Sequence, residues 1–386
     1  MSVFTAIRVS RAPFAGLGIV GLYWGTMAAM MPVIKAQAGA SDAAFGLALL
    51  GTAVAGMATT YIGPFLAEKL GRFLLTAAAL GIALAMQMTI FVSQTWQVLP
   101  MMVVMGLIMT TLDIGSNMRI SQLEERHGLH LMNVNHAMFS LCFGGAALFV
   151  AYLRQYGLGL AQVMPLMAVV IVLATLFTWE GAGWRPVEKG EGAEAPPTSL
   201  PWLVVLMTSV MLFVSFIGEN TIEAWSALFI ERTLGGAPGE GGFGPSTLGF
   251  VMFFFRLIGQ VTTERLGEER VVFASGVLGV IGLLVLATAP VQSQAIVGIA
   301  ITAVGMAVIV PTANSLLGKM VHREQRALAI SRAWLIGFSG FFVGPALIGF
   351  LSELFSLRVA FACVSVLVAS IIPAVIVIHG QRKGRA

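Results

Sequence analysis

The chain has 386 residues, of which 58% are hydrophobic and only 10% are charged, and its mean hydropathy is +0.90. An ordinary soluble domain carries roughly a quarter charged residues, so this composition excludes a typical soluble protein and indicates a chain folded in a lipid bilayer. The net charge of +4 does not indicate nucleic-acid binding, because the basic residues gather in short polar segments between apolar runs.

Twelve apolar runs follow one another along the chain, and each can form a transmembrane helix, which needs about 20 residues. The first run begins after Arg8 and Arg11 like a signal peptide, but its apolar stretch of about 20 residues exceeds the usual length of about 7–15. We therefore interpret it as the first span. The runs cover roughly residues 11–34, 43–66, 73–93, 97–118, 131–154, 158–180, 201–230, 245–262, 271–289, 293–317, 325–352 and 357–379.

The distribution of basic residues predicts the orientation of these spans. If both termini are cytoplasmic, the inside segments hold sixteen of the twenty-two Lys and Arg residues. The outside segments hold four, Lys35, Arg154, Arg232 and Arg358. A positive excess of this size favours cytoplasmic termini in a multi-pass protein of a bacterial inner membrane.

One hydrophilic stretch, residues 182–200, divides the runs into six and six. It contains three glutamates and the pair Pro196-Pro197, a composition typical of an exposed linker. We predict an N-terminal half at 1–181, a cytoplasmic linker at 182–200 and a C-terminal half at 201–386. No other loop is long enough to form a soluble catalytic or DNA-binding domain. Cys142 and Cys363 lie inside apolar runs and are expected to be free thiols.

The two halves carry a repeated element. Ala67-Glu68-Lys69-Leu70-Gly71 returns as Thr263-Glu264-Arg265-Leu266-Gly267, at an offset of 196 (264 minus 68). An offset of 197 places Lys35 on Arg232 and Asn117 on Asn314. A membrane chain made of two parallel copies of one half is typical of secondary transporters that bind solute between their halves.

A glycine pattern in the first run, Gly16-Leu17-Gly18-Ile19-Val20-Gly21, matches the dinucleotide-binding fingerprint only on paper. That fingerprint requires a preceding strand, whereas here the glycines lie inside an apolar span. Small residues in such a span allow neighbouring helices to approach closely. We therefore predict helix packing, and no cofactor or metal site.

The repeated element resembles the signature loop of the major facilitator superfamily, usually written G-x-L-A-D-R-x-G-R-R, which joins the second and third helices. Glu replaces Asp and Lys replaces Arg in this chain, and Pro64, Phe73 and Glu268 depart from the pattern. The resemblance implies an all-α membrane protein of twelve transmembrane helices, arranged as two six-helix pseudo-repeats. The matching positions are Leu66, Ala67, Glu68, Lys69, Gly71 and Arg72, with Glu264, Arg265 and Gly267 in the second copy.

Carboxylates in this loop can cap a neighbouring helix and pair with basic side chains. We expect Glu68, Lys69, Gly71 and Arg72, with Glu264, Arg265 and Gly267, to act as a cytoplasmic gate, although charge placed only for topology is the alternative. Glu124 and Glu125, at the end of the fourth span, are candidate partners for Arg72.

The seventh span carries two glutamates, Glu219 and Glu223, four residues apart on one helix face. Two carboxylates this close in a low dielectric disfavour double ionisation, which suits a site that binds and releases a proton. The alternative is that each glutamate pairs permanently with an arginine. Arg256 and Arg332 also lie within spans and need anionic partners, most simply in salt bridges, or else in contact with solute.

Other polar residues lie within the spans. Asp113 and Asn117 are four residues apart in the fourth span, and Asn133, His136 and Ser140 form one stripe in the fifth. A neutral imidazole can bind a hydroxyl or relay a proton, although a lone histidine is often satisfied locally.

In proteins of this superfamily the first, fourth, seventh and tenth helices line the central cavity. The resemblance implies that the solute or proton contacts Tyr23 or Trp24, Asp113, Asn117, Glu219, Glu223 and Asn314, with Asn133, His136, Trp225, Arg256 and Arg332 as further candidates. The segments G-E-x-x-I-E-x-W-S at 218–226, D-x-x-x-N at 113–117 and N-x-x-H-A-x-F-S at 133–140 also resemble a bacterial subgroup of uncharacterised facilitators and fucose-permease-like proteins.

We predict a secondary active transporter, not an enzyme, which acts by alternating access as a monomer. The leading function is proton-coupled symport of a small polar solute such as a sugar or organic acid. The alternative is drug or metabolite efflux by proton antiport. Antiporters of this superfamily commonly carry Gly-Pro in the fifth helix, whereas residues 131–155 contain no proline and Gly344-Pro345 lies in the eleventh run.

Overall fold

The computed structural model describes residues 3–129, 131–181, 200–322 and 325–383. At positions 53, 60, 64, 259–261, 264, 327 and 383 it describes the backbone only. The predicted linker therefore lies outside the described residues, apart from Leu200. Every regular element within the described part of the chain is a helix.

The first half holds the helices that correspond to the first six apolar runs. A short helix, α1 (Val3–Val9), precedes them. The others are α2 (Arg11–Gln37), α3 (Asp42–Leu70), η1 (Gly71–Phe73), α4 (Leu74–Ala85), α5 (Met88–Phe91), α6 (Thr95–His127), α7 (Met132–Gln155) and α8 (Leu160–Thr175).

The second half begins with α9 (Trp202–Leu228), which continues into the π-helical turn η2 (Phe229–Thr233). A short turn, η3 (Glu240–Gly242), leads into α10 (Phe243–Leu266). The remaining helices are α11 (Glu268–Ala287), α12 (Gln292–Met306), α13 (Ile309–Met320), α14 (Arg326–Gly337), α15 (Ser339–Leu354), α16 (Leu357–Ala369) and α17 (Ile371–Lys383).

Eleven helical stretches in the described chain are long and apolar enough to cross a membrane. They match eleven of the twelve predicted spans. The sixth span is a shorter helix, α8, of 16 residues. Beyond Thr175 the backbone changes to a tighter turn, in which Phe177 N–H donates to Ala174 O and Thr178 N–H to Thr175 O. The helical pattern therefore ends earlier than the apolar run, which continues to residue 180.

In both copies of the repeated element a helix ends before a glycine with positive φ. Helix α3 ends at Leu70 and is followed by Gly71 with φ of 53°, and α10 ends at Leu266 and is followed by Gly267 with φ of 84°. Positive φ is strained for residues with a Cβ atom, which explains a glycine at both positions. The same chain reversal thus follows the second and the eighth span.

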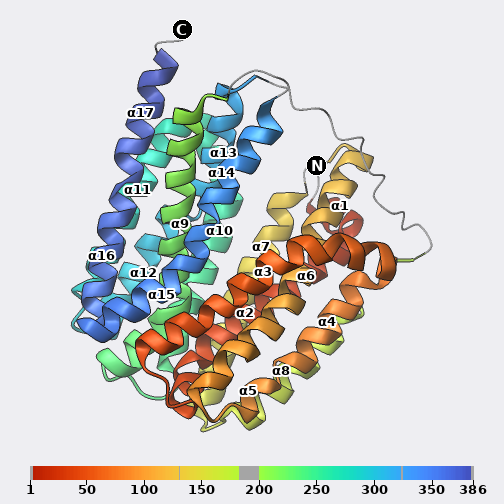
Figure 1. Ribbon diagram of the computed structural model, residues 1–386, viewed down its shortest axis with the longest axis vertical. Helices are drawn as coiled ribbons and strands as arrows, with labels where there is room; N and C mark the ends of the chain where they lie inside the picture. Colours follow the sequence, from red (N-terminus) through yellow and green to blue (C-terminus); the bar gives the residue numbers. More distant parts are fainter. Residues whose placement is uncertain (1–2, 130, 182–199, 323–324, 384–386) are drawn as a thin grey trace. The chain divides into compact units, whose positions relative to one another are not determined.

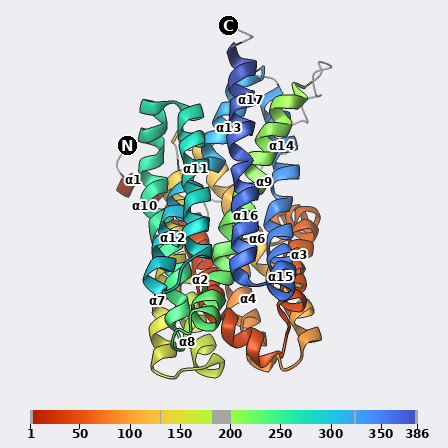
Figure 2. The same ribbon diagram turned by 90° about the vertical axis from the view of Figure 1, so that its left-hand side faces the viewer.

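Backbone contacts divide the chain into two compact units, whose boundaries differ from the predicted linker boundary. Unit 1 comprises Met1–Glu188 with Ala224–Phe253, and unit 2 comprises Lys189–Glu223 with Phe254–Ala386. Within unit 1, α2 packs along α7 and α3 along α6 (Figure 1). Within unit 2, α11 packs against α12 and α16 (Figure 2).

Close helix approach through glycine holds α2 against α7. A Cβ atom at Gly25 would lie 2.1 Å from the backbone oxygen of Phe143, and one at Gly21 would lie 2.3 Å from that of Phe139. Because Gly21 ends the glycine pattern of the first run, its role is helix packing, as the sequence predicts.

Replacing Gly25 with Ala should destabilise the protein, because the methyl group would have to displace a backbone carbonyl. Overpacking of this kind costs about 1–3 kcal/mol. We expect a melting temperature in detergent several degrees below that of the wild type. Gly145→Ala is the matched control, since nothing lies within 4 Å of its Cβ position. Equal melting temperatures for the two variants would contradict the packing role.

Candidate functional site

The acidic pair of α9 is split into one paired and one unpaired carboxylate, all within unit 2. Arg256 of α10 donates from Nη2 to Oε1 of Glu219 over 3.1 Å. Glu223, one turn further along α9, is only 8% exposed and makes no hydrogen bond or ion pair with another described residue. It remains within electrostatic reach of both Glu219 and Arg256. The alternative of a permanent arginine partner thus holds for Glu219, whereas Glu223 has no such partner among the described residues.

Arg332 differs from the expectation that it forms a salt bridge. Its side chain on α14 is exposed and makes no ion pair with a residue that the structure describes. An exposed guanidinium can be solvated, so it does not require the anionic partner that a buried one needs.

Within unit 1, α6 and α7 form a polar chain of three side chains. Asn117 donates from Nδ2 to Oδ1 of Asp113 over 3.1 Å, and its own Oδ1 lies 3.0 Å from Nε2 of His136. An amide oxygen can only accept a hydrogen bond, so Nε2 of His136 carries the proton. The amide of Asn117 therefore links an acid and an imidazole across two helices.

The other residues of the α7 stripe contribute differently. Ser140 donates to the backbone oxygen of His136 over 3.2 Å, and Asn133 is exposed near the start of the helix. Asn135, which the pattern did not single out, is fully buried and donates to Oγ of Ser10 over 3.0 Å. The stripe thus includes one side chain that joins the Asp113 chain and others that serve local structure.

Unit 2 contains a contact similar to that of Asn117, although the ring residues are not at equivalent positions of the repeat. Trp334 of α14 donates from Nε1 to Oδ1 of Asn314 on α13 over 3.1 Å. Asn314 is the residue that the repeat places on Asn117, and in each half a ring N–H binds its amide oxygen.

The aromatic candidates of unit 1 are largely buried. Tyr23 is fully buried, Trp24 is partly exposed, and their rings meet edge to face at 5.2 Å. Trp225 is fully buried against Phe45, at 6.4 Å between ring centroids, and its Nε1 has no hydrogen-bond partner among the described residues.

The predicted gate loops are exposed in this structure. Glu68, Lys69 and Arg265 make no ion pair with another described residue, and the Glu264 side chain lies outside the description. The guanidinium of Arg72 lies over the rings of Phe73 and Trp179, at 4.8 and 5.8 Å.

Arg72 forms no ion pair with either of its candidate partners, Glu124 and Glu125, in the described part of the chain. Oε1 of Glu124 instead accepts hydrogen bonds from the backbone N–H groups of Leu131 and Met132, at 2.5 and 2.9 Å. It caps the start of α7, because the first N–H groups of a helix lack intrahelical partners.

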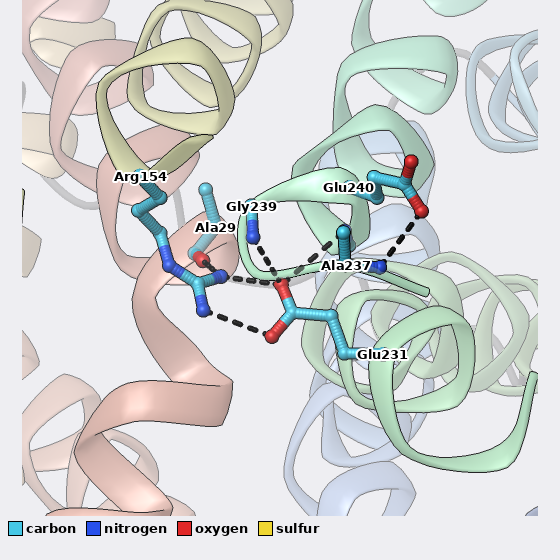
Figure 3. A network of polar contacts seen from close by, with 7 residues as sticks. Ala29, Arg154, Glu231, Ala237, Gly239 and Glu240 are labelled. Atoms are coloured by element: carbon cyan, nitrogen blue, oxygen red, sulfur yellow. Dashed lines mark hydrogen bonds and ion pairs between the residues drawn. The ribbon is translucent and has the colours of Figure 1, made fainter. Parts of the chain in front are cut away.

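Sequence reasoning missed an ionic cluster in unit 1 (Figure 3). Arg154 of α7 binds Glu231 of η2 with two hydrogen bonds, from Nη1 to Oε1 at 2.5 Å and from Nη2 to Oε2 at 2.9 Å. Oε1 also accepts from the backbone N–H groups of Gly239 and Gly241, at 3.1 and 3.3 Å. The arginine side chain is 6% exposed and that of Glu231 is 14% exposed, so this pair is well shielded.

A second part of the cluster surrounds Asp42 at the start of α3. Arg232 donates to both carboxylate oxygens, at 2.6 and 2.5 Å, and Nζ of Lys35 lies 3.0 Å from Oδ1. Lys35 and Arg232 are repeat equivalents, so the two copies of one basic position converge on a single carboxylate. The offset of 197 was the available signal, but the sequence does not show which acid they share.

Comparisons with known proteins agree on the type of fold. A family model described as Major Facilitator Superfamily matches residues 208–384. The chain is 27% identical over 356 residues to an uncharacterised MFS-type transporter of Yersinia pestis, covering 92% of this chain and 91% of that protein. It is 24% identical over 377 residues to an uncharacterised transporter of Sinorhizobium fredii, with coverages of 93% and 95%.

Solved transporter structures share the architecture over nearly the whole chain. The nucleoside transporter NupG matches with a TM-score of 0.71 at 14% identity, covering 98% of this chain and 99% of that one. A bacterial homologue of the human lysosomal transporter Spinster matches with a TM-score of 0.69 at 14% identity, covering 96% of each chain.

These matches and the helical architecture define a multi-pass membrane transporter rather than an enzyme. The chain matches the model of the major facilitator superfamily over residues 208–384, and it is similar to MFS-type transporters over nearly its whole length. Transporters of this type bind small-molecule solutes.

Breaking the Arg154–Glu231 pair should destabilise the protein, because it leaves one shielded charge without its partner. Such a loss costs about 3–5 kcal/mol. We expect Arg154→Gln and Glu231→Gln each to lower the melting temperature, and the double variant to lower it by less than the sum.

Glu240→Gln is the matched control, because the carboxylate of Glu240 binds the backbone N–H of Ala237 and no cation (Figure 3). It should melt close to the wild type. Additive effects of the two single substitutions would show that the pair contributes no coupling energy.

Proposed function

We propose that this protein is a proton-coupled symporter that moves a small polar solute across the bacterial inner membrane by alternating access. The observation that carries the proposal is that Glu219 and Glu223 differ in their ion pairing. Arg256 neutralises Glu219, whereas Glu223 is buried without a hydrogen bond or ion pair to a described residue. The coupling proton is assigned to Glu223.

The physical argument concerns the cost of an isolated charge. An ionised carboxylate removed from water without a partner is strongly unfavourable, whereas a protonated carboxyl is neutral. Glu223 can therefore be ionised where water reaches it and must be protonated where it is enclosed. A carboxyl that alternates between these conditions carries one proton per cycle, which is the property that symport requires.

The polar chain of Asp113, Asn117 and His136 is the second place where a proton could be bound. Asn117 links the other two side chains through hydrogen bonds of 3.1 and 3.0 Å. Since Asp113 already has a donor and Glu223 has none, we assign the chain to solute contact, together with Tyr23 or Trp24, and keep Asp113 as the alternative proton carrier.

The orientation is part of the proposal. Both termini and the linker at 182–200 are assigned to the cytoplasm. With this orientation the inside segments hold sixteen Lys and Arg residues and the outside segments hold four. The loops at Glu68–Arg72 and Glu264–Gly267 then lie inside, where they are proposed to gate access. The cluster of Arg154, Glu231, Asp42 and Arg232 then lies outside.

The test is a comparison of Glu223→Gln with the double variant Glu219→Gln/Arg256→Gln in proteoliposomes. A thermal-shift screen of solutes first identifies a ligand, because binding to the folded state alone raises the melting temperature. Glu223→Gln should still exchange that solute across the membrane but fail to accumulate it under an imposed pH gradient.

The double variant removes the ion pair as a unit and leaves no unpaired charge, so it should retain accumulation. The single variant Glu219→Gln is a poor control, since it frees Arg256 to pair with Glu223. If Glu223→Gln concentrates solute like the wild type, Glu223 is not the carrier. Accumulation that requires an outward-directed proton gradient, with the lumen more acidic than the outside, would support antiport instead.

A further inference from the structure

Four aromatic side chains of unit 2 form a continuous surface beside Asn314. Phe216 of α9 meets Trp334 at 5.6 Å, Phe338 at 5.7 Å and Phe341 at 6.5 Å between ring centroids. Phe338 and Phe341 stack at 5.9 Å with an angle of 9° between their planes. We call Phe216, Trp334, Phe338 and Phe341 the aromatic wall. Phe338 is 40% exposed and the other three rings are partly exposed, so the wall is not sealed inside the core.

A polar group is fixed in position beside this wall. Because Nε1 of Trp334 donates to Oδ1 of Asn314, the orientation of the amide is set. The amide nitrogen of Asn314 then makes no hydrogen bond with another described residue, and the side chain is partly exposed. Two N–H donors are therefore available next to the aromatic rings.

One member of the wall, Phe216, lies on the face of α9 that carries the acidic pair. Phe216, Glu219 and Glu223 are spaced i, i+3 and i+7 along α9, so their side chains share one stripe. At about 1.5 Å per residue, Glu219 lies about 4.5 Å and Glu223 about 10.5 Å along the helix axis from Phe216. One small solute could thus contact the wall and the turn that holds the acidic pair.

The repeat shows that this arrangement is not a requirement of the fold. At an offset of 196, the first-half equivalents of Trp334, Phe338 and Phe341 are Met138, Cys142 and Gly145. At the offset of 197 that aligns Lys35 with Arg232, Phe216 corresponds to Ile19. The first half forms the same helices without these aromatic rings. It also engages the amide nitrogen of Asn117 with Asp113, whereas the position equivalent to Asp113 at an offset of 197 is the apolar Val310.

We propose that Asn314 and the aromatic wall bind an uncharged solute that presents a ring face to the aromatic side chains and an acceptor oxygen to the amide. Aromatic surfaces stack well on ring faces, and a fixed amide donor adds orientation. A neutral solute fits because Glu219 already compensates the charge of Arg256. Cyclic sugars and nucleosides both have this chemistry. The inference deepens the proposed transport function and rests on it.

The test compares each ring with its open-chain counterpart by thermal shift of the purified full-length protein. D-glucose, D-galactose and D-mannose are compared with sorbitol, galactitol and mannitol, and uridine and adenosine are compared with ribitol, which lacks both the closed ring and the base. At least one cyclic probe should raise the melting temperature more than its open-chain counterpart. A response to sugars alone or to nucleosides alone identifies the source of the ring. If no cyclic probe exceeds its counterpart, the proposal is overturned.

Three variants locate the site with the best cyclic probe. Asn314→Ala removes the donors, Trp334→Phe keeps a ring but frees the amide, and Phe216→Leu removes one face of the wall. Each should weaken binding about three- to tenfold, the range expected for one hydrogen bond or ring contact. Phe350→Leu, which changes a half-exposed ring of α15 outside the wall, should bind like the wild type.

The experiments distinguish a failure of the proposed ring site from a failure of the proposed proton coupling. Glu223→Gln should keep the preference for cyclic probes even though it loses accumulation, because the wall and Asn314 are unchanged. If Asn314→Ala, Trp334→Phe and Phe216→Leu all bind the cyclic probe like the wild type, the ring site lies elsewhere and the proposal is contradicted. If Glu223→Gln keeps both the accumulation of solute and the preference for cyclic probes, only the assignment of the proton is contradicted.

Discussion

The ion pair between Arg256 and Glu219 determines what the rest of the acidic site can do. Two carboxylates and one guanidinium lie on neighbouring helices, and the guanidinium hydrogen-bonds to only one of the two carboxylates in this structure. The pair therefore leaves a buried carboxyl, Glu223, one turn away without a partner among the described residues. A site with two matched pairs would hold its charges permanently, whereas the role proposed for Glu223 requires a carboxyl without such a partner.

The two halves share a scaffold but differ in chemistry. Gly71 and Gly267 reverse the chain at equivalent places, and a ring N–H binds the amide oxygen of Asn117 in one half and Asn314 in the other. The first half then adds an acid, and the second adds aromatic rings. One asparagine thus has an acid beside it and the other has aromatic rings, and this difference is consistent with the separate roles proposed for the two sites.

Much of the fold could be predicted from the sequence, because helices in a bilayer leave strong signals. Apolar runs located eleven spans, and the repeat located the equivalent turns and asparagines. The sixth span was overestimated, since hydropathy does not record where α8 changes to a tighter turn. The i, i+4 spacing placed Glu219 and Glu223 on one face, because that relation lies within a single helix.

Contacts between helices were harder to predict. Residue spacing does not specify how each helix is rotated about its axis. It therefore could not show that Arg256 pairs with Glu219, or that neither arginine pairs with Glu223. The capping role of Glu124 was missed because its targets are backbone N–H groups, which every residue except proline carries. The Arg154–Glu231 pair was missed for a different reason: its partners are 77 residues apart and lie near loops.

The central claim, that Glu223 carries the exchangeable proton, can be tested most directly by infrared difference spectroscopy of the purified protein during a pH titration. A protonated carboxyl absorbs at a carbonyl frequency distinct from that of a carboxylate, so no solute need be known. The account predicts a carboxyl band that disappears as the pH rises, is absent in Glu223→Gln, and persists in Glu219→Gln/Arg256→Gln. A band that persists in Glu223→Gln, and disappears instead when Asp113 is replaced by Asn, would contradict it.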